Sequence, residues 1–127
     1  MSSLRLYSTV VDCHDALALS RFWAAALGWE LRQQEPDWAS VGDPDGPQRL
    51  GFEPVPEGKT VKNRLHLDLL PQQGVDREVE RARLEALGAR LLRTVLEGDL
   101  VAHDVMADPE GNEFCLLEPY DAYFSEG

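Results

Sequence analysis

Two polar side chains that could bind a ligand or a metal ion alternate with leucines in one short segment. His66 and Asp68 stand between Leu65, Leu67 and Leu69. Successive side chains of a strand point to opposite faces, so the leucines are expected to pack under a helix while the two polar residues point the other way. The opposite register would bury a carboxylate, which costs several kcal/mol. Asp68 can orient the His66 ring as a general base or metal ligand, or can itself bind a cationic or hydroxylated group.

Two further segments are expected to present side chains opposite their apolar faces. In the segment 49–53 the apolar residues occupy alternate positions, which leaves Glu53 on the other face of its strand. In the segment 113–117 the same alternation leaves Cys115 on the other face of its strand. A thiol is reactive only where its pKa is lowered. We therefore expect Cys115 to be a buried, unreactive residue of the site wall.

An aromatic residue completes the predicted ligand-binding set. Trp38 follows Pro36 and Asp37 at the start of an expected strand. An aromatic ring at the mouth of a cavity can stack on a planar ligand. The predicted ligand-binding residues are therefore His66, Asp68, Glu53, Trp38 and Cys115.

Other polar residues are weaker candidates for chemistry. His14 adjoins the start of an expected helix and is predicted to lie in a surface loop. His103 lies within an expected strand whose two faces carry competing apolar residues, so its face stays open. Ser8 could be combined with His66 and Asp68 into a catalytic triad, but nothing in the sequence marks Ser8 as a nucleophile.

Two helices are expected to position these residues. The first spans residues 15–27, between the N-cap Asp15 and Gly28. Its predicted buried stripe consists of Leu19, Phe22, Trp23, Ala26 and Leu27. The second spans residues 76–87 and ends at Gly88, with a predicted buried stripe of Val79, Ala82, Ala86 and Leu87. Its charged residues are expected to form a solvated face with pairs three and four residues apart.

The rest of the chain reads as short strands joined by turns. The expected strands are 4–11, 30–34, 38–41, 49–53, 64–70, 90–95, 100–106 and 113–117. The order of elements is therefore β-α-β-β-β, twice. The sequence Ala-Leu-Gly occurs at residues 26–28 and 86–88, and Asp-Pro-x-Gly occurs at 43–46 and 108–111. Both pairs occupy equivalent points of the two halves, which indicates an internal repeat.

Length and charge restrict the class of protein. The chain has 127 residues, enough for one domain that buries a core without disulfides or metals. Its 12 basic and 23 acidic residues give a net charge of −11, which argues against binding to nucleic acid or to anionic membranes. From the first residues and the short apolar runs we expect neither a signal peptide nor a membrane-spanning segment. Two distant cysteines, Cys13 and Cys115, are typical of reduced thiols, so we expect a cytoplasmic protein.

Three motifs, taken in this order and spacing, resemble the vicinal oxygen chelate superfamily and look like its glyoxalase-like branch. They are Asp12-Cys13-His14-Asp15 with Phe22-Trp23 and Leu27-Gly28-Trp29, the segment 62–69, and the segment 108–114. The superfamily includes glyoxalase I, extradiol dioxygenases, fosfomycin-modifying enzymes and bleomycin-resistance proteins. The resemblance implies an α+β fold of two βαβββ modules that enclose a cavity, in a single domain spanning residues 1–127. Module one would cover about 1–58, module two about 61–120, and a tail 121–127.

The resemblance also implies where a metal would bind. Metal-dependent members hold it through four inward positions, on the first, fourth, fifth and eighth strands. Here these fall near Ser8, at Gly51 (or at Glu53, one pleat further), at His66 and at Cys115. His66 and Glu53 are therefore the predicted metal ligands, in a site that is incomplete because a stable site needs three or four protein ligands. We expect no cofactor, with a divalent metal as the alternative.

Three functions are compatible with this pattern. The first is a small-molecule-binding protein, and the acidic bleomycin-resistance relatives, which bind cationic drugs between subunits, favour it. The alternative is a metal-dependent lyase, isomerase or oxygenase that acts on a small oxygenated substrate. The third is a regulatory module without chemistry. The resemblance further implies a homodimer, for which Tyr123 and Phe124 offer apolar surface; Tyr120 is a further tail aromatic.

Overall fold

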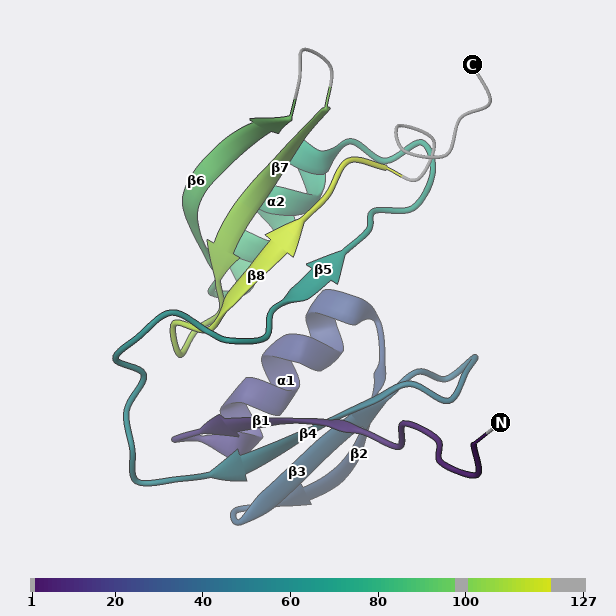
Figure 1. The fold of residues 1–127 in the computed structure, drawn as a ribbon, viewed down its shortest axis with the longest axis vertical. Helices are drawn as coiled ribbons and strands as arrows, with labels where there is room; N and C mark the ends of the chain where they lie inside the picture. Colours follow the sequence, from purple (N-terminus) through teal and green to yellow (C-terminus); the bar gives the residue numbers. More distant parts are fainter. Residues whose placement is uncertain (1, 98–100, 120–127) are drawn as a thin grey trace. The chain divides into compact units, whose positions relative to one another are not determined.

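The computed structural model describes residues 2–97 and 101–119. The chain divides into two compact units, residues 1–58 and 59–127. Within the described residues each unit consists of one helix and a four-stranded mixed sheet (Figure 1). The predicted fold class is therefore confirmed: the protein is α+β, with two βαβββ modules.

The first module follows the predicted order. Its elements are β1 (Thr9–Cys13), α1 (Ala16–Leu27), β2 (Glu30–Glu35), β3 (Trp38–Gly42) and β4 (Arg49–Pro54). The strand order in the sheet is β1-β4-β3-β2, with β1 parallel to β4 and the other pairs antiparallel. The prediction that the first strand begins at Leu4 is wrong. Thr9 already lies opposite Leu50, next to the first residue of β4, so the residues before Thr9 have no partner strand in this sheet.

Helix α1 is built as its sequence indicates. The side chain of Asp15 accepts a hydrogen bond of 3.0 Å from the backbone N–H of Ala18, which caps the first turn. Gly28 ends the helix with φ of 69°, a left-handed conformation that glycine adopts without strain. The buried residues include Leu19, Phe22, Trp23 and Ala26 of the predicted stripe. They pack toward the face of the sheet that carries the fully buried Phe52 and Val41.

The second module repeats this plan. Its elements are β5 (Leu67–Leu69), α2 (Arg77–Leu87), β6 (Arg90–Glu97), β7 (Val101–Ala107) and β8 (Glu113–Leu116). The strand order is β5-β8-β7-β6, and β5 is parallel to β8. Strand β5 is shorter than the predicted 64–70 because it pairs only with β8, whose first residue is Glu113. Leu65 lies before the strand and is 81% exposed, so the prediction that it packs under the helix is wrong.

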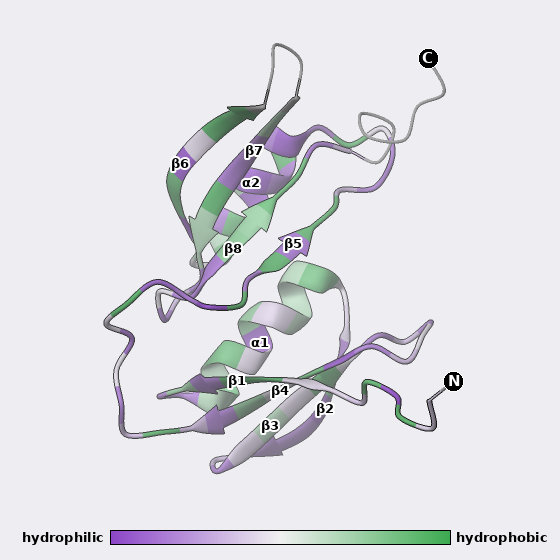
Figure 2. Ribbon diagram, in the orientation of Figure 1, coloured by the Kyte–Doolittle hydropathy of each residue, from purple (hydrophilic) through white to green (hydrophobic). Residues whose placement is uncertain are grey.

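Helix α2 faces its sheet with two arginines and Leu84 rather than with the predicted apolar stripe. Arg77 and Leu84 are buried, whereas the predicted stripe of Val79, Ala82, Ala86 and Leu87 is exposed. Hydrophilic bands run along its ribbon in Figure 2. The predicted buried stripe of this helix is therefore wrong. The predicted solvated face is confirmed for Glu78, Arg83 and Glu85, and Arg83 pairs with Glu80 three residues away, but Arg77 and Arg81 turn toward the sheet instead.

The cause of this reversal is a buried carboxylate in β7. Asp104 is completely buried, and a buried charge must be paired. Nη1 of Arg77 lies 3.2 Å from Oδ1 of Asp104, and Nη1 of Arg81 lies 3.2 Å from Oδ2. The hydroxyl of Thr94 donates to Oδ1 at 2.7 Å. These contacts turn the arginine face of α2 toward the sheet.

The remaining structural predictions concern single residues. His14 is exposed, and its Nε2 lies 3.1 Å from the carbonyl oxygen of Glu57, as expected for a loop residue. The tail aromatics Tyr120, Tyr123 and Phe124 lie outside the described residues. Among the described residues, no helix is long and apolar enough to cross a membrane.

Candidate functional site

Asp68 and Cys115 are direct neighbours on the paired strands β5 and β8. Phe114 and Leu116, on either side of Cys115, are buried, and Leu116 lies opposite Asp104, the carboxylate that α2 contacts. Because side chains alternate along a strand, Cys115 and Asp68 occupy the face of the second sheet opposite α2. This is the face that the alternation of leucines predicts for Asp68.

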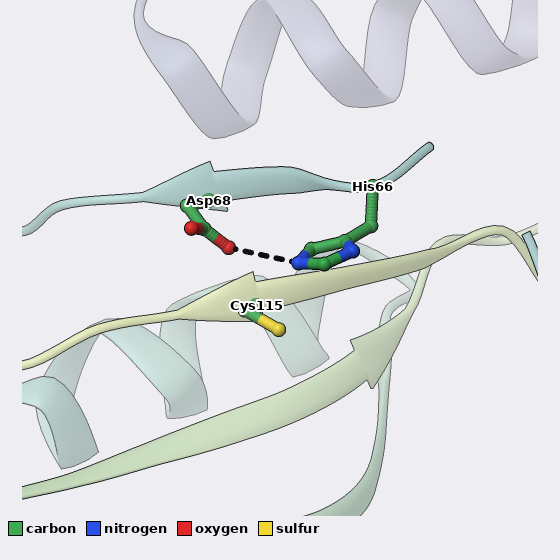
Figure 3. A group of neighbouring side chains, drawn as sticks. All are labelled: His66, Asp68 and Cys115. Carbon is green, nitrogen blue, oxygen red and sulfur yellow. Dashed lines mark ion pairs between the residues drawn. The ribbon is translucent and has the colours of Figure 1, made fainter. Parts of the chain in front are cut away.

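His66 joins these two residues from the position just before β5. Its Nε2 lies 3.3 Å from Oδ1 of Asp68, and the side chains of His66 and Asp68 are 45% and 54% exposed. One donor atom from each of His66, Asp68 and Cys115 lies within 4.8 Å of the other two. Figure 3 shows His66 and Asp68 directed toward each other, with Cys115 beside them on the neighbouring strand. An imidazole, a carboxylate and a thiol therefore meet on one face.

The segment before His66 is fixed to β8 by a carboxylate. Glu113 accepts a hydrogen bond of 3.0 Å from the backbone N–H of Asn63 and one of 3.1 Å from Nζ of Lys59. Burial raises the pKa of Glu113, but the hydrogen bonds from Asn63 and Lys59 and the charge of Lys59 outweigh it and lower the pKa below 4.5. Glu113 is thus ionised at neutral pH, and it fixes the chain segment that precedes His66 through Lys59 and Asn63.

A turn fixes the other strand of the site. Oδ1 of Asp108 accepts hydrogen bonds from the backbone N–H groups of Glu110 and Asn112, at 2.9 and 3.0 Å. Gly111 has φ of 89°, which closes the turn. As the sequence predicts, this segment is the turn that leads into β8, so it sets the position of Cys115.

The thiol of Cys115 is neutral at physiological pH. Burial raises its pKa above the ordinary value of 9.0, and the charge of Asp68 and a hydrogen bond with Asp68 raise it further. The positive charges of Lys62 and Arg93 act in the opposite direction and lower the pKa in part. Arg93 lies opposite Val105, which lies opposite Cys115, so all three belong to the same face. Two cations therefore lie near the thiol.

The first module carries the other two predicted ligand-binding residues. The indole of Trp38 lies over Gly51, and its Nε1 donates a hydrogen bond of 3.0 Å to the side chain of Gln33. Ser40 donates to the same amide oxygen at 2.7 Å. Glu53, two residues beyond Gly51 on the face opposite α1, is exposed. Trp38 is therefore held by its neighbours, whereas the side chain of Glu53 is exposed.

The structure brings together three of the five predicted residues, all in the second module. His66, Asp68 and Cys115 form one cluster, whereas Trp38 and Glu53 belong to the first module. Sequence reasoning missed Lys62 and Arg93. Arg93 could have been assigned only from the pairing of β6 with β7, which contains an irregularity between Leu91 and Arg93. The same pairing settles the face of His103, which lies two residues from Val105 and shares the face of Cys115.

A family comparison agrees with this architecture. The family model for the glyoxalase-like domain matches residues 8–117, which include both modules. The chain belongs to the glyoxalase-like family. It is thereby a member of the vicinal oxygen chelate superfamily, as the three sequence motifs indicate.

Solved structures share the fold of this glyoxalase-like domain at low sequence identity. A glyoxalase/bleomycin resistance protein/dioxygenase family enzyme from Burkholderia phytofirmans is 20% identical, with a TM-score of 0.69 over 90% of this chain and 98% of its own. Lactoylglutathione lyase from Agrobacterium tumefaciens is 14% identical, with a TM-score of 0.66 over 94% of this chain and 96% of its own. The fosfomycin resistance protein FosX from Mesorhizobium loti is 12% identical, with a TM-score of 0.69 over 93% of this chain and 93% of its own. No curated protein matches the sequence.

The four metal positions implied by the superfamily do not fit this glyoxalase-like domain as a set. Gly51 carries no donor atom, and a Cβ added there would lie 2.4 Å from Cη2 of Trp38, so this position holds an indole rather than a ligand. Ser8 is not one of the usual ligand types. His66 and Cys115 supply donors at the other two positions. The role of Glu53 as a metal ligand stays a prediction.

Proposed function

We propose that this glyoxalase-like domain binds a small oxygenated molecule through His66, Asp68 and Cys115. The observation that carries the proposal is the His66–Asp68 pair at 3.3 Å, which is half-exposed on the sheet face opposite α2. The side chains of His66 and Asp68 are exposed on that face, whereas the charged residue on the other face, Asp104, is buried and paired with α2. Their presence there is best explained by contact with a ligand.

The chemistry of these groups favours a ligand with hydroxyl, carbonyl or carboxylate oxygens. The contact between Asp68 and Nε2 of His66 orients the imidazole and leaves its other ring nitrogen for a ligand group. The neutral thiol of Cys115 forms part of the wall. Lys62 and Arg93 supply positive charge near it, which would attract a ligand oxygen that carries negative charge.

The first module contributes its own candidates to the proposal. Trp38 presents an aromatic ring that the side chain of Gln33 holds in place, and such a ring can stack on a planar group. Glu53 is an exposed carboxylate on the corresponding face of the first sheet. We propose both as ligand-binding residues, independently of the cluster in the second module.

An enzyme is the second candidate function. A histidine oriented by a carboxylate has the arrangement of a general base, and it would serve a lyase, isomerase or oxygenase acting on a small oxygenated substrate. The half-exposed His66–Asp68 pair favours this alternative. Turnover of a bound compound that His66→Ala abolishes would establish it.

We also propose that the protein is a homodimer, as relatives of this fold commonly are. Sedimentation at micromolar concentration is expected to give twice the mass of 14.2 kDa. A single species of one chain's mass would contradict this part of the proposal.

A thermal-shift screen of small carboxylates, diols and hydroxy ketones tests the binding function. A compound at one hundred times its Kd stabilises the protein by about 2.7 kcal/mol. We expect His66→Ala and Asp68→Asn to fold as the wild type does, because both side chains are exposed, but to lose this stabilisation. His14→Ala is the matched control, since His14 is an exposed histidine of the first module. Compounds whose effect survives His66→Ala and Asp68→Asn would overturn the proposal.

A further inference from the structure

A row of paired residues crosses the face of the second sheet opposite α2, which we call the site face. Arg93 on β6 lies opposite Val105 on β7, which in turn lies opposite Cys115 on β8. Cys115 pairs with Asp68 on β5. Directly paired residues place their side chains on the same face of a sheet. The site face therefore runs from an arginine on one side to the His66–Asp68 pair on the other, across three strand spacings of about 14 Å in all.

Small buried side chains form the floor between these two sides. Val105 and Cys115 are buried, and so is Ala107, which lies two residues after Val105 on the same face. Ala107 pairs with Arg90, so a second arginine of β6 borders the floor. The side chains of Arg90 and Arg93 are both exposed. Two guanidinium groups therefore flank one side of an apolar floor.

An irregularity in β6 directs Arg93 to the site face. The pairing with β7 shifts just before Arg93, so that Leu92 is an extra residue in the strand. Regular pairing would place Leu92 opposite Val105 and would place Arg93 opposite Asp104, the buried carboxylate that α2 contacts. Bulges of this kind occur next to active sites, where they re-aim a side chain. Here the bulge moves a positive charge from the side of α2 to the site face.

In the part of the chain that the structure describes, neither Arg90 nor Arg93 forms an ion pair. Two carboxylates that border the floor are engaged elsewhere, because Asp68 contacts His66 and Glu113 accepts hydrogen bonds from the segment before β5. Unbalanced positive charge is unexpected in a chain with 23 acidic and 12 basic residues. An anionic group of the ligand would balance it.

We propose that Arg90 and Arg93 bind the carboxylate of the ligand, and that the ligand is a hydroxy acid whose hydroxyl group binds the His66–Asp68 pair. A guanidinium group matches the planar shape of a carboxylate with two parallel N–H donors. The small side chains of the floor leave room for an apolar part of the ligand between its two polar ends. This inference rests on the proposed function, because it uses the same His66–Asp68 pair and names the class of oxygenated molecule.

Isothermal titration calorimetry of the full chain with a series of hydroxy acids tests the carboxylate end. The series consists of para-hydroxybenzoate, para-hydroxyphenylacetate and para-hydroxyphenylpropionate, in which the carboxylate lies progressively further from the hydroxyl group. Each acid is compared with its uncharged amide. We expect at least one acid to bind about tenfold more tightly than its amide, because hydrogen bonds between charged groups are stronger than those to a neutral amide. Equal affinities for acid and amide throughout the series, or no binding of any acid, would overturn the proposal.

Arginine variants assign the preference for the acid to the two residues. Arg90→Met and Arg93→Met should each weaken binding of the acid by about tenfold or more and leave the Kd of the amide unchanged. Both side chains are exposed, so we expect the variants to fold as the wild type does. Arg83→Met is the matched control, since Arg83 is an exposed arginine on α2, on the other side of the sheet. A preference for the acid that survives both Arg90→Met and Arg93→Met would overturn the anion subsite.

His66→Ala separates this inference from the proposed function. It should weaken binding of acid and amide alike, because both carry the hydroxyl group. If His66→Ala weakens the binding of thermal-shift hits while neither arginine variant changes any Kd, the anion subsite is wrong and the proposed binding function stands. If the arginine variants weaken binding of the acid while His66→Ala changes no Kd, the proposed function at His66 is wrong, and so is the hydroxyl end of this inference.

Discussion

The indole of Trp38 covers Gly51 so closely that a Cβ added at Gly51 would lie 2.4 Å from its Cη2 atom. The two residues come from neighbouring strands, β3 and β4, and share one face of the first sheet. Gly51→Ala is therefore expected to displace the ring and to destabilise the protein by about 1–3 kcal/mol, as overpacking does. Chemical denaturation measures this free energy.

A double-mutant cycle identifies the cause of that loss. In a Trp38→Ala background the added methyl group meets no ring, so Gly51→Ala should cost less than in the wild type. An equal cost in both backgrounds would show that the Trp38 ring does not occupy the position described.

The buried charge cluster on α2 leads to a second prediction. Asp104 is paired with Arg77 and Arg81 and is completely buried. Asp104→Ala leaves two arginines without their carboxylate, so we expect a loss of about 3–5 kcal/mol in the free energy of unfolding. Breaking the more exposed Arg83–Glu80 pair with Glu80→Ala should cost about 0.5 kcal/mol or less. Similar losses for the two variants would contradict the packing of α2.

This cluster also explains where sequence reasoning failed. The helices and the order of elements along the chain follow from local signals such as the cap Asp15, the two glycines after the helices and the alternation of leucines. The orientation of α2 does not, because it depends on Asp104 in β7, 17 residues after the helix ends at Leu87. The periodicity of an isolated helix cannot reveal a buried carboxylate that a distant strand presents to it.

For the candidate site, too, local patterns predict one part and the pairing of distant segments decides the other. Alternation within single segments places Asp68 and Cys115 correctly on one face, because the period of a strand is a local property. The parallel pairing that makes them neighbours, and the approach of Arg93 across two antiparallel strands, depend on register between distant segments. Leu65 was misplaced for the same reason, since the length of β5 is set by β8.

The pH dependence of stability should reflect Glu113. Hydrogen bonds from Asn63 and Lys59 hold the pKa of Glu113 below 4.5 in the folded protein despite the opposing effect of burial. A carboxyl group with a lowered folded pKa stabilises the protein above its unfolded pKa, and this contribution is lost as the pH falls through the folded pKa. Urea denaturation from pH 7 to pH 3 should therefore show a difference between wild type and Glu113→Gln that shrinks on acidification. A difference that grows toward low pH would contradict this assignment.

The reactivity of Cys115 should depend on Asp68. Burial and the neighbouring carboxylate raise the pKa of the thiol above 9.0. In a Cys13→Ser background, alkylation by iodoacetamide is expected to be slow at pH 7 and faster above pH 9, because the thiolate is the nucleophile. Asp68→Asn removes the negative charge and should accelerate alkylation at pH 7. An unchanged rate would show that Asp68 does not act on this thiol.

The most direct measurement follows the backbone amide resonances of the full chain by NMR during titration with a carboxylate, diol or hydroxy ketone that stabilises the protein in the thermal-shift screen. We expect the largest shift changes in residues 62–69 and 113–117, which contain His66, Asp68 and Cys115. Much smaller changes are expected at the acidic turn 43–45 of the first module. Changes centred on that turn or on other acidic segments, or no changes at all, would contradict the claim that the chemistry of this chain lies at His66, Asp68 and Cys115.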